Sequence, residues 1–142
     1  LGNKEEVKKY LAEGMDLNQA VNEDGSTALQ VAAVFDRTEI ALLLIENGAD
    51  IEVKKDDGAT ALHVASFFGR VELVKALLEK GADKTVKTND GASALDSVSS
   101  SFEEVRPVYE FLEGLLAPVG FKLDYDLLQE NRPKIAEMLR AE

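Results

Sequence analysis

The chain has no cysteine, no tryptophan and one histidine among its 142 residues. Without cysteine there are no disulfides and no thiolate metal sites, and one histidine is a poor basis for a zinc centre. No apolar run approaches the roughly 20 residues that cross a bilayer, so we expect no membrane insertion. The single histidine also leaves little room for a Ser-His-Asp arrangement. We therefore expect neither a metal nor a cofactor.

Basic side chains are the minority among the charged residues. There are 16 Lys and Arg against 27 Asp and Glu, a net charge of −11. Nucleic-acid binding relies on a basic face that displaces counterions, so this balance excludes nucleic acid as the expected partner. It favours solubility first, and a protein partner with a basic surface second.

Length and composition predict one globular domain. Hydrophobic residues make up 45% of the chain, the usual fraction for a protein with a buried core. The sequence starts with leucine rather than methionine, and we expect that an upstream segment has been removed. A secretion signal could have been part of it, so the sequence leaves the compartment open.

An internal repeat organises most of the sequence. The segment DGSTALQVA at residues 24–32 recurs as DGATALHVA at 57–65 and as DGASALD at 90–96. The shared glycines lie at 25, 58 and 91, a period of 33 (58 − 25 = 91 − 58). A second marker, Gly-Ala-Asp at 48–50 and again at 81–83, keeps the same step. Such a period predicts a solenoid of stacked units.

Each part of the repeat has a structural role. Asp-Gly predicts a tight turn, and the hydroxyl residue two positions after the glycine is suited to cap a short helix. We predict these first helices over about 28–35 and 61–68. A longer amphipathic helix follows, with Val71, Val74, Leu77 and Leu78 on one face. The polar remainder of each repeat predicts an extended finger that turns back on itself.

This combination of period and motifs resembles the ankyrin repeat. The resemblance covers residues 1 to about 117 and implies an all-α ankyrin-repeat solenoid with C-terminal capping helices. Alanine replaces the proline that the family usually has before the leucine of the motif. The family's histidine is kept only as His63, whose ring would bond to backbone between neighbouring fingers. Asp36 stands where the family has glycine, which predicts an altered or strained turn between the two helices.

The resemblance divides the chain into five segments. Residues 1–24 form an N-terminal half-repeat and first finger, with a helix over 3–14 but no first helix. Two full repeats cover 25–57 and 58–90, a divergent repeat covers 91–117, and a helical cap covers 118–142. Pro107 places the start of the divergent repeat's long helix near Glu104, and Pro133 predicts two short helices in the tail. The tail is similar to extensions of some bacterial ankyrin proteins, which favours a bacterial source.

The sequence argues against catalysis. His63 already has a structural role, and the paired acids Glu23-Asp24 and Asp56-Asp57 lie on turns, where carboxylates are solvated. Nothing in their spacing predicts a pocket in which several would converge on calcium or a glycosidic bond. We therefore expect a protein that is not an enzyme.

The resemblance implies a partner-binding surface made of finger tips and the last residues of the first helices. Val34, Phe35, Phe67 and Phe68 could form one apolar stripe bordered by acids, with Phe35 and Phe68 exposed. Alternatively, one phenylalanine of each pair points into the core. The candidate binding residues are Glu23, Asp24, Ser26, Val34, Phe35, Asp56, Asp57, Ala59, Phe67, Phe68, Asn89 and Asp90, with Ala92, Ser100 and Ser101 at the equivalent places of the divergent repeat.

The most direct functional hypothesis is non-catalytic recognition of a protein partner on the concave face. Two alternatives remain open. The chain could be a regulatory or targeting domain of a larger protein. It could also be a self-assembling structural spacer, joined through an N-terminal end that the missing first helix leaves uncovered, frayed or free to self-associate.

Overall fold

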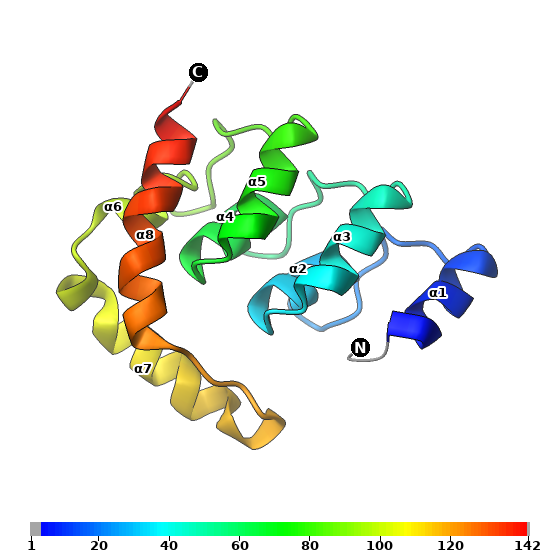
Figure 1. The fold of residues 1–142 in the computed structure, drawn as a ribbon, viewed down its shortest axis with the longest axis horizontal. Coiled ribbons are helices and arrows are strands. Elements are labelled where there is room, and N and C mark those ends of the chain that lie inside the picture. Colours follow the sequence, from blue (N-terminus) through cyan, green and yellow to red (C-terminus); the bar gives the residue numbers. More distant parts are fainter. Residues whose placement is uncertain (1–3, 142) are drawn as a thin grey trace.

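The structure, a computed structural model, describes residues 4–141 (Figure 1). These residues form eight α-helices and one 3-10 turn, with no strand among them, so the all-helical prediction is confirmed. The helix predicted over 3–14 is present but ends at Ala12, and its expected first residue, Asn3, lies outside the described residues. The elements are α1 (Lys4–Ala12), α2 (Ala28–Val34), α3 (Thr38–Glu46), α4 (Ala61–Phe67), α5 (Val71–Glu79), α6 (Asp96–Ser99), α7 (Phe102–Leu116), η1 (Ala117–Val119) and α8 (Tyr125–Arg140).

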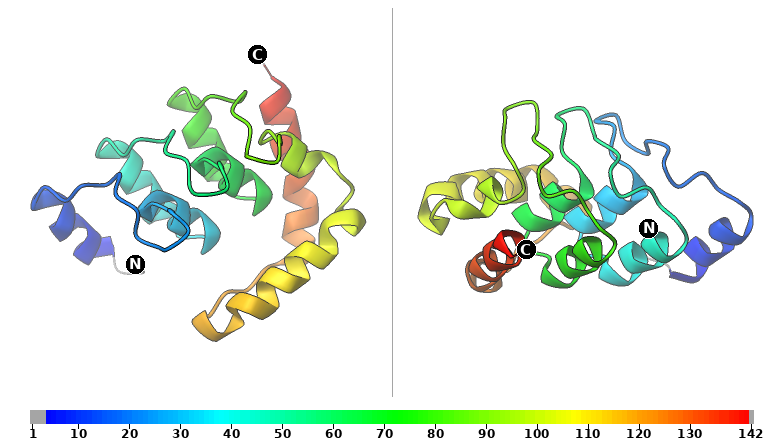
Figure 2. Two further views of the ribbon diagram at one scale, coloured as in Figure 1. Left: turned by 180° about the vertical axis from the view of Figure 1, so that it is seen from behind. Right: turned by 90° about the horizontal axis from the view of Figure 1, so that it is seen from above.

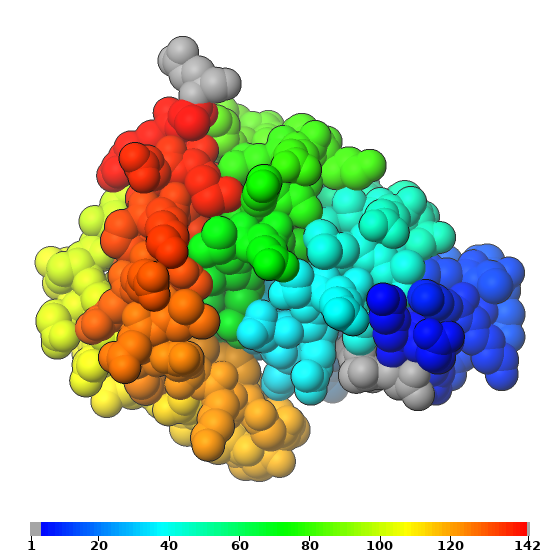
Figure 3. Space-filling view, in the orientation of Figure 1, coloured from blue at the N-terminus to red at the C-terminus, as the bar shows by residue number. Residues whose placement is uncertain are grey.

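The helices stack in two rows. The inner row consists of α2, α4 and α6, and the outer row of α1, α3, α5 and α8, each helix packing on the next (Figure 1). The space-filling view shows the outer row as adjoining bands (Figure 3). Between the rows lies a continuous core of Leu, Ile, Val and Ala side chains, including Leu29, Leu62 and Leu77. The fingers, residues 13–27, 47–60 and 80–95, project together to one side (Figure 2).

The inner helices begin where the repeat motif predicts. The Thr27 side chain accepts a hydrogen bond from the Gln30 N–H, and Gln30 accepts one in return from the Thr27 N–H, which forms a capping box. In the next repeat Thr60 is the N-cap, and the His63 ring accepts from its N–H at 3.2 Å. These reciprocal bonds satisfy backbone donors that have no partner inside the helix.

His63 joins two neighbouring fingers, as predicted. A backbone N–H can only donate, so Nδ1 of His63 is the acceptor for Thr60 and Nε2 carries the hydrogen. Nε2 then donates to the Ala92 carbonyl at 3.1 Å. Gln30 does the same work one repeat earlier, donating from Nε2 to the Val53 carbonyl at 2.8 Å. Glutamine can take the place of histidine because each side chain offers one acceptor for the N-cap N–H and one donor for a carbonyl of the next finger.

Asp36 adopts the left-handed conformation that its position requires, with φ of 58°. Its counterpart 33 residues later is Gly69, with φ of 72°. An L-residue pays a steric cost in this region that glycine does not, so the strain predicted at the α2–α3 turn is present. Arg70 reinforces this turn, donating to the Ala33 and Val34 carbonyls at 2.9 and 2.6 Å.

Neither proline has the predicted effect: Pro107 does not mark the first turn of its helix, and Pro133 does not divide the tail into two helices. α7 begins at Phe102 rather than near Glu104, with Ser101 as N-cap and Pro107 inside the helix. α8 is one continuous helix through Pro133. Proline leaves the carbonyl four residues earlier without its helical donor, here those of Glu103 and Gln129. Both residues are exposed, so water can satisfy these carbonyls and packing holds the helices together.

The tail helix α8, and not α7, continues the outer row. α8 packs on both α5 and α6, the position that a second helix of the fourth repeat would take. α7 belongs to neither row and crosses the lower end of the solenoid (Figures 1 and 2). We infer that residues 102–124 are an insertion between the two helices of the last repeat. This reading replaces the assignment of α7 to the repeat and of α8 to a separate cap.

Buried polar groups fasten α7 to the solenoid. The Tyr109 hydroxyl donates to the Phe67 carbonyl of α4 at 2.5 Å and accepts from Arg132 of α8 at 2.9 Å. Arg132 also donates to the carbonyls of Ser97 and Ser100 at 2.9 and 2.7 Å. Tyr109 is 0% and Arg132 3% exposed. One hydroxyl therefore links α4, α7 and α8.

Between residues 4 and 141, none of the helices combines the length and the apolar character that a membrane span requires.

Candidate functional site

A groove of about 450 Å³ runs between the fingers, the inner helices and α7. We call it the finger groove. Fingers supply its polar end, the carboxyl-terminal halves of α2 and α4 supply its floor, and Leu112 and Leu116 of α7 form the opposite wall. Its lining residues are Asn22, Asp24, Ser26, Gln30, Val31, Val34, Phe35, Lys55, Asp57, Ala59, His63, Val64, Phe67, Phe68, Thr88, Ala92, Ser93, Ser97, Leu112 and Leu116.

The floor contains a cluster of aromatic rings. Phe121, which follows η1, packs edge-on against Phe35 at 5.8 Å and against Phe68 at 5.7 Å between ring centroids. Phe67 packs on Tyr109 of α7 at 4.6 Å. Phe121 is itself only 3% exposed and supports Phe35 and Phe68, which line the floor. The groove is thus bounded by side chains that lie far apart in the sequence.

The expected exposure of Phe68 is wrong. Phe68 is 9% exposed because its ring packs against those of Phe67 and Phe121 at 5.1 and 5.7 Å and lies under the Arg70 guanidinium. Phe35, Phe67 and Val34 are half-buried. The alternative that one phenylalanine of a pair faces the core therefore holds for the second pair, where Phe67 is the ring that stays partly accessible.

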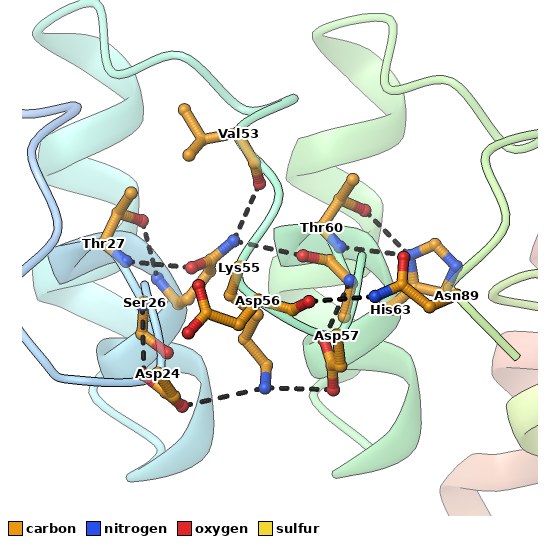
Figure 4. A network of polar contacts seen from close by, with 12 residues as sticks. Asp24, Ser26, Thr27, Val53, Lys55, Asp56, Asp57, Thr60, His63 and Asn89 are labelled. Atoms are coloured by element: carbon orange, nitrogen blue, oxygen red, sulfur yellow. Dashed lines mark hydrogen bonds and ion pairs between the residues drawn. The ribbon is translucent and has the colours of Figure 1, made fainter.

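A lysine between two aspartates marks the polar end of the groove. Lys55 Nζ lies 3.7 Å from Asp24 Oδ2 and 3.1 Å from Asp57 Oδ2, so it bridges the first and second fingers (Figure 4). The hydrogen bond from the Ser26 side chain, with a further contribution from Lys55, holds the pKa of Asp24 below its ordinary value. The groove thus carries two carboxylates and one ammonium at this end.

Several predicted binding residues are also structural parts of the fingers. Asp24 and Asp57 each use one oxygen to accept the N–H two residues ahead, at 3.0 Å, which leaves the other oxygen for Lys55. Asp56 and Asn89 lie against the neighbouring turn glycine. A Cβ on Gly58 would be 2.9 Å from the Asn89 backbone nitrogen, so glycine at this turn permits the fingers to stack closely.

The structure separates the predicted residues into two groups. Ser26 and Ala59, expected at the contact surface, are 6% exposed each. Glu23, Asp56, Asn89 and Asp90 are exposed on the fingers but do not line the groove. Ser100 and Ser101 also lie outside the groove. The Ser100 carbonyl accepts a hydrogen bond from Arg132, and the Ser101 side chain caps α7. The predicted residues that do line it are Asp24, Ser26, Val34, Phe35, Asp57, Ala59, Phe67, Phe68 and Ala92.

Several residues that line the groove were not among the predicted binding residues, including Lys55, Leu112 and Leu116, and neither was Phe121, which packs against two rings of the floor. Lys55 could have been predicted from the sequence, since it immediately precedes Asp56 and Asp57, both of which were predicted binding residues. The two leucines were recognised only as the apolar face of a helix. Their place in the groove depends on how α7 folds back, which no local pattern indicates.

The groove has the chemistry of a binding surface. Among residues 4–141, no three His, Asp or Glu side chains converge as metal ligands would. The lone imidazole, His63, is occupied on both nitrogens by finger contacts. What the groove offers is an apolar floor and wall with polar backbone, hydroxyl and carboxylate groups at one end, the usual composition of a recognition site.

A second hollow of about 210 Å³ lies at the N-terminal end of the solenoid. α1 stands in the outer row without an inner-row partner, so the neighbouring apolar side chains stay partly uncovered. Tyr10, Met15 and Val21 are 44%, 54% and 47% exposed there. The predicted uncovered N-terminal face is therefore present in the described residues.

Comparison with known proteins agrees with this architecture. The sequence model for ankyrin repeats, in three copies, matches residues 1–88. No curated protein matches the chain. The matched region contains α1 to α5 and the first two fingers, and it covers more than half of the sequence. The chain belongs to the ankyrin-repeat family.

Proposed function

We propose that this chain is a non-catalytic recognition module that holds a protein partner in the finger groove. Ankyrin repeats are in general protein–protein interaction modules and typically not enzymes. The observation that carries the proposal is the groove itself, about 450 Å³ with an apolar floor that the chain's own side chains leave open. A partner side chain would find hydrophobic contact there and polar groups at one end to orient it.

The charge of the groove supports a partner with basic groups. Lys55 is shared by two carboxylates, and further acids stand on the fingers at Glu23, Asp56 and Asp90. With a net charge of −11, the chain also attracts basic surfaces at long range, which speeds association more than it adds affinity.

Affinity capture from a lysate of the source organism tests the proposal. The groove variant Val31→Ser/Leu116→Ser removes apolar surface from the floor and from the wall. Leu127→Ser is the matched control, since Leu127 is 48% exposed on α8 and does not line the groove. Circular dichroism first establishes that all three proteins are folded.

The expected result is a protein retained by the wild type and by Leu127→Ser but lost by the groove variant. Its affinity, measured with purified partner, should fall at least about tenfold in the groove variant. Equal retention by all three baits places the contact elsewhere and contradicts the proposal.

A second candidate function is self-association through the N-terminal face, favoured by the hollow beside α1. Analytical ultracentrifugation over a range of concentrations compares the wild type with Met15→Lys, which puts a charge on that face. Self-association predicts an oligomer in the wild type that the variant dissociates. A wild-type chain that stays monomeric at high concentration rules this function out.

A further inference from the structure

α7 has two apolar sides, and the solenoid uses only one of them. Tyr109, Leu112 and Leu116 face the repeats and the groove. On the adjoining side, Val108, Phe111 and Leu115 are 47%, 67% and 62% exposed. We call these three residues the free α7 stripe. Their spacing of three and four residues places them in one line along the helix.

The free α7 stripe is continuous with the wall of the finger groove. At about 100° per residue, Val108 lies between the directions of Leu115 and Leu112, and Leu116 lies about 40° beyond Leu112. The apolar surface therefore turns around the helix from the groove to the open side without a polar interruption. Isolated exposed apolar residues are common, but a connected line of three beside a groove is typical of an interaction surface.

Acidic residues border this surface. Glu104 lies on the same side of α7 as Val108 and Phe111, one turn earlier, and Glu103 and Glu110 are exposed farther around the helix. The only basic residue of α7, Arg106, is folded back over the rings of Phe102 and Tyr125 at 5.3 and 5.6 Å. It leaves the glutamates on the open side without a neighbouring positive charge from α7.

This charge pattern disfavours a second copy of the chain as the occupant. Two α7 helices packed stripe to stripe would bring their glutamates together, between molecules that each carry −11. A partner helix with lysine or arginine beside its apolar face would instead pair with those glutamates. The line of apolar residues at helical spacing suits a helix, because ridges of one helix fit between side chains of another.

We propose that the free α7 stripe and the finger groove form one docking surface for a cationic amphipathic helix of a partner protein. The part of this proposal that concerns the finger groove rests on the proposed function, whereas the part that concerns the free α7 stripe does not. The partner helix lies along α7, with apolar side chains over Phe111 and Leu115 and one end reaching into the groove. Its basic residues border Glu104 on one side and approach the finger acids Asp24 and Asp57 on the other.

Fluorescence polarisation with synthetic helices tests this inference. The probe is a labelled peptide of about 15 residues with leucines along one face, lysines bordering them and alanines elsewhere. A control peptide carries glutamate in place of every lysine. The proteins are the full chain, the stripe variant Phe111→Ser/Leu115→Ser, the groove variant Val31→Ser/Leu116→Ser, and Leu127→Ser. The stripe side chains are largely exposed, so this variant should keep the fold, which circular dichroism verifies.

The expected result is saturable binding of the lysine peptide that weakens at least about tenfold in the stripe variant and is unchanged in Leu127→Ser. The glutamate peptide should not bind. Weakening in the groove variant alone overturns the inference but leaves the proposed function standing. Equal binding of the two peptides, or no binding of the lysine peptide below about 1 mM, overturns it as well. So does a wild-type dimer that Phe111→Ser dissociates, since the occupant would then be a second copy.

Discussion

Removal of the Tyr109 hydroxyl should loosen α7 without changing its apolar packing. Tyr109→Phe keeps the ring and its contact with Phe67 at 4.6 Å. It removes the donor to the Phe67 carbonyl and one of the acceptors of Arg132, which is 3% exposed. A partly buried carbonyl without a donor costs about 1 kcal/mol, the lower end of the range for a buried one, and a hydrogen bond to a charged group contributes about 1.5–3 kcal/mol.

Because one hydroxyl makes both bonds, the two costs overlap, and we expect a loss of about 3 kcal/mol in the free energy of unfolding. Urea denaturation followed by circular dichroism measures it. With a urea slope of about 2 kcal/mol per molar, the midpoint should fall by about 1.5 M. The rate of amide hydrogen exchange should increase mainly in α7, since solenoids open locally.

Tyr125→Phe is the matched control. Its hydroxyl donates to Glu113 at 3.1 Å in a partly solvated position, so its loss should change stability by no more than about 0.5 kcal/mol. If Tyr109→Phe falls within that same range, water replaces the hydroxyl and the anchor reasoning is refuted. A loss of about 3 kcal/mol in the free energy of unfolding, with amide exchange equally faster in α2 to α5, would also contradict the local role assigned to Tyr109.

The same residue predicts a pH dependence. Burial raises the pKa of Tyr109 above 10.0, while Arg132 opposes the shift. A raised folded pKa means that its stabilising effect is complete below pH 10 and is lost as pH rises through the folded pKa. Unfolding free energy should therefore fall above pH 10 in the wild type, and less steeply in Tyr109→Phe. Identical slopes in the two proteins would show that Tyr109 does not contribute.

Three further changes test other parts of the fold. Ser66→Ala should raise stability by about 1 kcal/mol in urea denaturation, because the Ser66 hydroxyl is buried without a hydrogen-bond partner; a loss would reveal a bond at that oxygen. Gly69→Ala should lower it by at least about 1 kcal/mol, since φ is 72° and a Cβ would lie 2.8 Å from a Leu128 methyl carbon; an unchanged midpoint would show that α8 can shift. The Thr85 hydrogen bonds lower the pKa of Asp83, so the stabilisation from Asp83 is present above pH 3.8 and is lost on further acidification. In Asp83→Asn, the free energy of unfolding should therefore fall less steeply with acidification than in the wild type. Parallel curves for the two proteins would refute this.

Local sequence specified the repeated unit because each of its steps depends on residues that are close in the chain. The Asp-Gly turn needs a positive φ, which Gly25, Gly58 and Gly91 supply. The threonine cap and its partner three residues later then set the helix start. The role of His63 was implied by the resemblance to the ankyrin repeat, and its bonds to Thr60 and Ala92 agree with it.

Sequence reasoning failed where two distant segments compete for one surface. Both α7 and α8 carry apolar faces, and periodicity cannot say which of them packs on α5. Pro133 suggested a break in the tail, yet α8 stays continuous because Leu128 and Ile135, on either side of Pro133, are both buried. Helix-breaking tendencies are overridden when burial on both sides exceeds the loss of one exposed hydrogen bond.

By itself, the sequence determined that this protein is a stack of 33-residue helical pairs with projecting fingers, because those features follow from turns, caps and periodicity within each unit. Only the tertiary structure decided what the groove contains. Phe121 lies more than fifty residues from Phe68 in the chain and covers its ring, while Leu112 and Leu116 become a wall. These contacts depend on the long-range path of residues 102–124, which is set by packing and by the buried Tyr109–Arg132 pair, and by no local pattern.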